Sequence, residues 1–250
     1  MSDADPTLLA AAAAETGGGH HEPHDAGAMG RLNWLRAGVL GANDGIVSTA
    51  GLVIGVAAAT NNRAAIFTAG LAGLAAGAMS MAVGEYVSVS TQRDSERAMV
   101  AKERLELAQL PHTELLELAE IYEGKGLPPS LALDVAKALT EHDALAAHAE
   151  AELGIDPDDL TNPWHAAIAS MISFTMGALL PLLAILNPAT GWRIPGTVVV
   201  VLVALALTGY ISARLGGAAI GRAVLRVVLG GILAMAVTYG IGRLFGTAVS

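Results

Sequence analysis

Two acidic residues lie inside long apolar stretches of the sequence. Asp44 lies in a stretch over residues 37–60, and Glu85 lies in a second stretch over residues 64–91. An ionisable group at membrane depth costs several kcal/mol, less near a helix end, and is typical of an ion pathway. Asp44 lies seven residues after Ala37, and Glu85 lies eight residues before Arg93. At 1.5 Å per residue, both carboxylates lie roughly 10–12 Å inside the same boundary. We therefore expect them to converge on one cation.

A thioether accompanies the second carboxylate. Met81 lies four residues before Glu85 and shares its face of the predicted helix, where it would supply a softer ligand. The alternative is that both acids lie among lipid headgroups or cap polar backbone. In that case Asn43-Asp44-Gly45 is a break in the helix, and Met81 is an ordinary packing residue.

Residues 92–164 carry a second group of candidate ligands. Six of them are carboxylate or imidazole side chains that lie three or four residues from a partner on the same predicted helix: Glu103 with Glu106, Glu114 with Glu117, and His148 with Glu152. Carboxylates at this spacing on facing helices form metal sites in helical bundles. Without thiolates the set suits Mn²⁺, Fe²⁺ or another first-row ion. The alternative is a solvated acidic face, since Lys102 and Glu106 also have the spacing of an ordinary ion pair.

The distribution of charge predicts the elements that hold these residues. Of the 250 residues, 53% are hydrophobic and 15% are charged, whereas soluble domains carry about 25% charged residues. All 23 acidic residues lie at or before Asp159, and the run from Ile194 to Ala213 contains no charge. A helix of about 20 such residues crosses a bilayer. We therefore expect an all-α integral membrane protein with five transmembrane helices, over residues 37–60, 64–91, 165–187, 194–213 and 223–246.

The segment between the second and third spans is expected to be a cytosolic insertion of three helices, over residues 92–164. The first helix continues from the second span to about Leu110, the second begins at an N-cap at Thr113, and the third reaches Leu153 with a break near His142. Placing the insertion in the cytosol puts 11 of the 14 basic residues on the inner side, in agreement with the positive-inside rule.

Several classes of protein are excluded by composition. In a chain of net charge −9, 14 basic residues make no patch for nucleic acid. The lack of cysteine excludes a disulfide framework, a thiolate zinc site and a cysteine nucleophile. An enzyme is not expected, because an intramembrane aspartyl protease needs two catalytic aspartates and the spans contain one.

The first 30 residues are expected to form a disordered tail without a signal peptide. This tail contains His20, His21 and His24, which either collect metal or are inert. The first apolar stretch is then expected to stay in the membrane.

Two motifs resemble the vacuolar iron transporter family. They are GANDG at residues 41–45, followed by GLVIGV at 51–56, and AMSMAVGEYVSVS at 78–90; the similarity extends from about residue 31 to the end. The resemblance implies a five-span dimer that exchanges Fe²⁺ or Mn²⁺ for protons and carries a cytosolic metal-binding helical domain. It implies that Asp44 and Met81 lie on the membrane pathway. In the insertion it implies a metal site formed by Glu103, Glu106, Glu114 and Glu117, with Glu152 nearby and with His148 where some members have methionine.

The resemblance includes one departure in the second span. Iron-storing eukaryotic members carry glutamate where this chain has Gly73 and glycine where it has Glu85; the Gly-Glu-Tyr form seen here is common in bacterial members. Gly73 and Gly77 also have small-xxx-small spacing, which indicates close helix packing either within one subunit or at a dimer interface.

Together these features predict a proton-coupled exporter of divalent metal in the lipid bilayer, in the inner cell membrane if the source is bacterial. It is expected to be a homodimer, with no permanently bound cofactor and with Fe²⁺ or Mn²⁺ as substrate. The insertion would gather cytosolic metal, and Asp44, Met81 and Glu85 would pass it through the membrane. The alternative function is a membrane-anchored metal sensor or buffer that transports nothing. Paired acids in the spans favour transport, because a buffer needs none.

Overall fold

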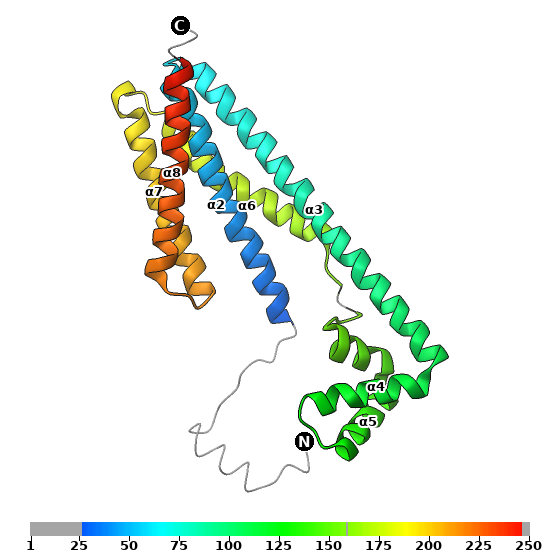
Figure 1. The fold of residues 1–250 in the computed structure, drawn as a ribbon. Helices are drawn as coiled ribbons and strands as arrows, with labels where there is room; N and C mark the ends of the chain where they lie inside the picture. Colours follow the sequence, from blue (N-terminus) through cyan, green and yellow to red (C-terminus); the bar gives the residue numbers. More distant parts are fainter. Residues whose placement is uncertain (1–26, 159, 247–250) are drawn as a thin grey trace. The chain divides into compact units, whose positions relative to one another are not determined.

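The computed structural model describes residues 27–158 and 160–246, with side chains from residue 38 onward except that of Thr190. The chain divides into two units, residues 1–35 and 36–250, and the packing described below belongs to the second. Throughout the described residues the regular elements are helices (Figure 1): α2 (Gly27–Ala59), α3 (Arg63–Gln109), α4 (Pro111–Gly124), α5 (Pro129–His148), the π-helix η1 (Ala149–Leu153), α6 (Pro163–Ile185), α7 (Thr190–Leu215) and α8 (Ile220–Gly246).

Five helices within the described ranges are long and apolar enough to cross a membrane, namely α2, α3, α6, α7 and α8. The predicted all-α fold with five candidate membrane spans is confirmed. Each predicted span falls on one of these helices, although α2 begins earlier than predicted, at Gly27, and α3 continues past its predicted span to Gln109. The predicted histidine tail lies outside the described residues, and α2 begins at Gly27, inside the range predicted for that tail.

The apolar helices pack closely because glycines line their contacts. A Cβ at Gly45 of α2 would overlap the carbonyl oxygen of Phe174 in α6, and a Cβ at Gly242 of α8 would overlap that of Gly55. Small residues of this kind allow helix backbones to approach one another in a membrane. The core formed around α2 consists of Ile46, Ala50, Val53, Ile54, Ile66, Leu182, Ile185, Val201, Leu205 and Met235.

One continuous helix, α3, joins the membrane part to the insertion. Asn62 caps its start, where the side-chain oxygen accepts hydrogen bonds from the N–H groups of Ala64 and Ala65 at 3.0 and 3.2 Å. The helix then runs for 47 residues to Gln109, as predicted. Pro111 begins α4 directly afterwards, so the N-cap predicted at Thr113 is wrong. A proline suits the first turn of a helix because its φ is fixed and its missing N–H would have had no partner there.

The third helix of the insertion is interrupted as predicted, one residue after the expected position. Asp143 has φ −159° and ψ 98°, which is not helical, and its side-chain oxygen accepts a hydrogen bond from the Ala146 N–H at 3.0 Å. The helix therefore restarts at a new N-cap. It ends in η1, after which Gly154 adopts the left-handed conformation with φ 65°. Between α4 and α5 a small core forms from Leu118, Ala119 and Ala136.

Candidate metal sites

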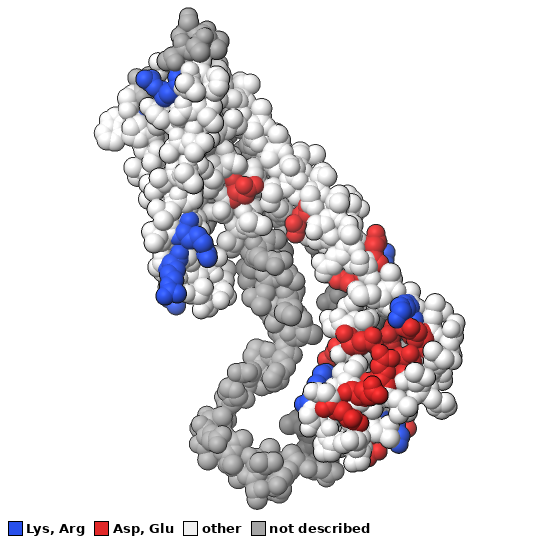
Figure 2. All heavy atoms as spheres, viewed as in Figure 1, with Lys and Arg blue, Asp and Glu red and all other residues white. Residues whose placement is uncertain are grey.

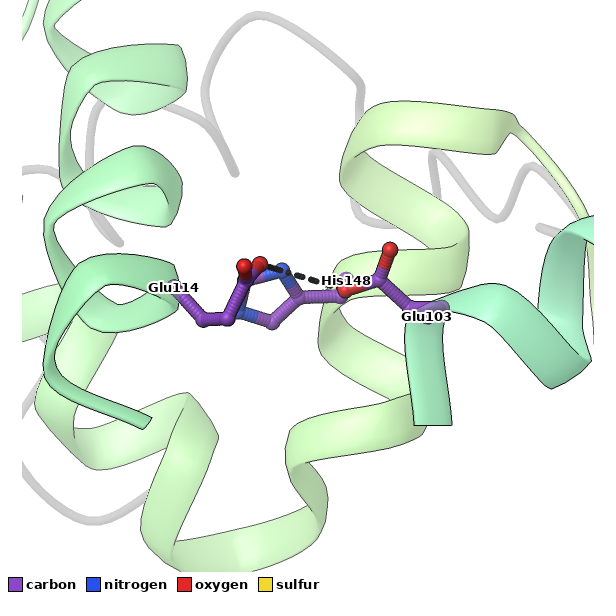
Figure 3. Close-up of side chains that lie close together, drawn as sticks. All are labelled: Glu103, Glu114 and His148. Carbon is purple, nitrogen blue, oxygen red and sulfur yellow. Dashed lines mark ion pairs between the residues drawn. The ribbon is translucent and has the colours of Figure 1, made fainter. Parts of the chain in front are cut away.

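Three side chains from three helices meet inside the insertion (Figure 3). The Nδ1 atom of His148, from α5, lies 3.1 Å from Oε1 of Glu103 in α3 and 3.8 Å from Oε2 of Glu114 in α4. One ligand atom from each residue lies within 4.8 Å of the other two. The residues are 0%, 3% and 5% exposed for His148, Glu103 and Glu114. We call these three residues the insertion cluster.

Local chain geometry creates this meeting. The chain turns at Pro111, where α4 begins directly after α3, and a ligand atom of Glu114 then lies within 4.8 Å of one of Glu103. The break at Asp143 starts a new helical segment, and this segment ends at His148. A π-helix is wider than an α-helix and commonly lies at a functional site. Glu152 lies within the π-turn that follows His148, and it is exposed while His148 is buried.

The buried polar atoms of the insertion cluster have no hydrogen-bond partners among the described residues. This holds for both ring nitrogens of His148 and for Oε1 of Glu103. Buried polar atoms in proteins are nearly always paired, and an exception calls for an explanation such as a bound ion. Two carboxylates and an imidazole that face one another supply what a divalent first-row cation requires. The insertion cluster can therefore coordinate such a cation.

Burial also sets the protonation of the insertion cluster, which lies beyond the apolar part of α3. Burial, reinforced by the charge of Glu152, raises the pKa of Glu103 to about 7. Burial raises the pKa of Glu114 as well, and it lowers the pKa of His148. At neutral pH His148 is therefore neutral, which is the form that binds metal, while Glu103 is about half protonated.

The other three predicted ligands of the insertion surround the cluster. The charges of Glu106, Glu117 and Glu152 all raise the pKa of Glu103, so all three lie near it. Glu106 accepts a hydrogen bond from Lys102 Nζ at 2.8 Å, which is the ion pair expected from the spacing. Acidic side chains gather over this part of the molecule (Figure 2). The predicted set thus separates into a buried group of three and an outer acidic group of three.

A cavity of about 200 Å³ lies among the apolar helices α2, α3 and α6. Asp44 and Met81 both line it, as do the hydroxyl side chains of Ser48, Thr49 and Ser80. Thr49 is buried, and its Oγ1 has no hydrogen-bond partner among the described residues. We call this space the Asp44 cavity. It offers a carboxylate, hydroxyl groups and a thioether to a cation within the predicted membrane region.

Glycines make room for the Asp44 cavity. A Cβ at Gly73 would overlap the side chain of Leu52, and a Cβ at Gly77 would overlap the ring of Phe174. All four residues line the cavity. The small-xxx-small pair of α3 therefore packs against side chains of its own chain, which supports the first of the two roles left open by the sequence.

Glu85 is half-buried and does not line the Asp44 cavity. It lies one turn beyond Met81 on α3, about 6 Å nearer the insertion. Its neighbour Tyr86 stacks against Trp164 in the first turn of α6, with ring centroids 4.8 Å apart. The equal depth of Asp44 and Glu85 stays a prediction. The two carboxylates do not line one common cavity.

Sequence reasoning did not find three residues that line the cavity. Ser48 lies four residues after Asp44, so helical spacing alone would have placed it on the same face. Thr49 and Phe174 gave no such signal, because the crossing of α2 and α6 that brings them to the cavity depends on glycine contacts between segments far apart in the chain.

Most of the chain matches a known protein family. Residues 35–243 match the VIT family. The chain belongs to this family. It is 44% identical over 220 residues to "Vacuolar iron transporter" of Acanthamoeba castellanii, covering 88% of this chain and 81% of that protein. It is 38% identical over 252 residues to "Vacuolar iron transporter homolog 1" of Oryza sativa subsp. japonica, covering 97% and 89%. With "Vacuolar iron transporter homolog 2.1" of Arabidopsis thaliana the identity is 36% over 221 residues, covering 88% and 85%.

Proposed function

We propose that this VIT-family protein is a proton-coupled transporter that exports Fe²⁺ or Mn²⁺ from the cytosol. The observation that carries the proposal is the Asp44 cavity, where a carboxylate and a thioether from Met81 face the same space among apolar helices. Ionisable groups at membrane depth mark ion pathways. Relatives that share most of the chain's length and are named vacuolar iron transporters support metal as the cargo.

The positions of the acidic residues suggest a direction of passage. The outer acidic group and the insertion cluster would concentrate cytosolic metal. Glu85, one turn nearer the insertion than Met81, would receive the ion before Asp44 and Met81 do. A divalent ion and protons both neutralise these carboxylates, so they would compete for the same sites, and protons from the far side would displace the metal.

The donor atoms favour first-row transition metals over Ca²⁺ or Mg²⁺. Hard cations prefer ligand sets made wholly of oxygen, whereas the insertion cluster contributes an imidazole and the Asp44 cavity a thioether. Imidazole suits iron and neighbouring metals. Both Fe²⁺ and Mn²⁺ fit this set.

We further propose that the working unit is a homodimer. Leu40, Asp44, Ser48 and Leu52 follow one another at intervals of four residues along α2, and all are exposed in the single chain. Exposing a carboxylate to lipid has a high free-energy cost. A second copy packed along this stripe would remove Asp44 from lipid and close the open side of the cavity.

The second candidate function is a membrane-anchored buffer or sensor. The insertion cluster favours it, because its three ligands are buried and would hold an ion without any pathway through the membrane. The two functions differ in one measurable respect, since only a transporter moves metal across a sealed bilayer.

The test is metal flux into liposomes that contain the purified protein and a metal-sensitive dye, with and without an imposed pH difference. We expect flux to increase with the pH difference, Asp44→Asn to abolish it, and Glu85→Gln to reduce it and weaken its dependence on pH. Asp134→Asn, at an exposed carboxylate of α5, is the matched control and should retain wild-type flux.

Two results would contradict the proposal. Full activity of Asp44→Asn would remove Asp44 from the pathway, and flux that ignores the pH difference would exclude proton coupling. Metal binding without flux in any condition would favour the buffer.

A further inference from the structure

The hairpin of α7 and α8 has uncompensated positive charge. Arg214 lies in the last turn of α7, and Arg222 and Arg226 lie in the first two turns of α8. All three are exposed. The sequence contains no acidic residue after Asp159, and no ion pair with a carboxylate forms at these arginines within the described residues. Figure 2 shows basic side chains gathered on this end of the hairpin, without acidic side chains beside them.

Each helix of the hairpin combines these charges with an exposed apolar stripe. On α8, Leu225 and Leu229 share a face with Arg222 and Arg226, since the four residues follow at helical spacing. The two leucines are 58% and 55% exposed. The stripe thus changes from cationic at the start of the helix to apolar within two turns.

On α7, too, a cationic residue lies nearest the hairpin turn and exposed apolar residues lie further from it. Arg214 shares a face with Tyr210 and Ile211, and Leu207 lies one turn further from the hairpin turn. Leu207, Tyr210 and Ile211 are all exposed. Both stripes therefore place cations at the hairpin turn and hydrocarbon side chains on the way toward the middle of the helix.

One arginine is held in position. Arg214 Nε donates a hydrogen bond to the Tyr210 hydroxyl at 3.2 Å, and its guanidinium lies 5.8 Å from the centre of the tyrosine ring. Tyrosine favours the level of lipid headgroups because its ring is apolar and its hydroxyl is polar. The contact therefore holds Arg214 beside a residue type that favours the headgroup level.

We propose that the α7–α8 hairpin is a binding site for an anionic phospholipid. The phosphate and the acidic headgroup bind Arg214, Arg222 and Arg226, and the acyl chains lie along the leucines of the two stripes. The charges and the apolar side chains together match a lipid, since a free phosphate has no use for the stripes. An acidic protein segment, such as the insertion, would bind the arginines but leave the exposed leucines uncovered. The proposal is independent of transport activity.

Native mass spectrometry of the whole protein in neutral detergent tests this site. The protein is offered phosphatidylglycerol or phosphatidylcholine with identical acyl chains. We expect retention of phosphatidylglycerol to exceed that of phosphatidylcholine, and glycerol phosphate not to displace it. An arginine near an anionic surface contributes a factor of roughly fivefold to binding. The variant R222Q/R226Q should therefore retain several-fold less phosphatidylglycerol than the wild type.

The matched control removes two charges elsewhere. K125Q/K137Q changes two exposed lysines of the insertion and should retain phosphatidylglycerol as the wild type does. Equal retention of the two lipids by the wild type, or unchanged retention by R222Q/R226Q, would overturn the proposal. Displacement of phosphatidylglycerol by glycerol phosphate would mean that the site binds phosphate alone and not the lipid. A loss of thermal stability by R222Q/R226Q without lipid, with no lipid preference in the wild type, would instead assign the arginines to a protein contact.

Discussion

His148 and Glu103 face each other in the insertion cluster, and their buried polar atoms lack hydrogen-bond partners among the described residues. Either a proton or a metal ion can bind between them. With the Glu103 pKa at about 7, the carboxyl is mostly protonated below neutral pH and can then donate a hydrogen bond to the imidazole, whose Nδ1 lies 3.1 Å from Oε1. Above neutral pH the deprotonated carboxylate and the neutral imidazole both offer lone pairs. A cation then replaces the proton, so binding of metal at the insertion cluster releases a proton.

The affinity of the protein for Mn²⁺ should therefore fall as pH falls. The fraction of Glu103 that is deprotonated decreases roughly tenfold from pH 8 to pH 6 when the pKa is about 7. His148 does not oppose this trend, because its pKa is lowered and it stays neutral. Isothermal titration calorimetry on the purified protein at several pH values measures the change.

The variants for this measurement are matched in chemistry. Glu103→Gln should bind more weakly and lose most of the pH dependence, whereas Glu120→Gln, at an exposed position of α4, should behave as the wild type. An affinity for Mn²⁺ that is constant between pH 6 and pH 8, or unchanged in Glu103→Gln, would mean that these acidic residues form a solvated surface and not a metal site.

The helices themselves could be predicted from the sequence, and their contacts could not. Proline and glycine mark the ends of α3, α4 and η1, so the boundaries follow from residues close to them in the chain. The contact of His148 with Glu103 joins residues 45 positions apart. The break near this point could be predicted, but the direction that the new segment takes after Asp143, which brings His148 to Glu103, does not follow from helical periodicity. The Asp44 cavity, which Met81 lines and Glu85 does not, likewise depends on how α2, α3 and α6 cross.

Close packing of α6 against α2 can be tested with a single methyl group. A Cβ at Gly177 would overlap the carbonyl oxygen of Ala42, and backbone cannot move aside as a flexible side chain can. Gly177→Ala should therefore destabilise the protein by about 1–3 kcal/mol. The matched control is Gly84→Ala on α3, where a Cβ would meet nothing within 4 Å.

Thermal unfolding in detergent measures this difference. We expect the transition of Gly177→Ala to lie several degrees below that of the wild type and that of Gly84→Ala to lie close to it. Equal transitions for the two variants would mean that the helices separate easily at this crossing.

Acidic and basic residues are concentrated in different parts of the sequence. Residues 92–164 contain 16 of the 23 acidic residues, while the hairpin at the end of α7 contains arginines alone. The expected cytosolic position of the insertion rests on the distribution of basic residues, and it places the loop between α6 and α7 on the opposite side.

This topology is simple to test because the chain contains no cysteine. A single cysteine at Lys125, between α4 and α5, should be protected from a membrane-impermeant thiol reagent in intact cells. A single cysteine at Ala189, just before α7, should react. Both positions are exposed in the structure, so burial within the protein does not account for the difference. The reverse pattern of labelling would invert the topology.

The unbroken length of α3 limits how the insertion can serve the membrane site. Glu103 and Met81 lie on this one helix, 22 residues and therefore about 33 Å apart. An ion cannot be handed directly from one ligand to the other over such a distance. If the insertion captures metal for transport as proposed, the ion would have to dissociate and diffuse to the membrane site. One ion released within a sphere of that radius corresponds to a local concentration on the order of 10 mM. Fast release from the insertion would then matter as much to the rate of passage as tight capture.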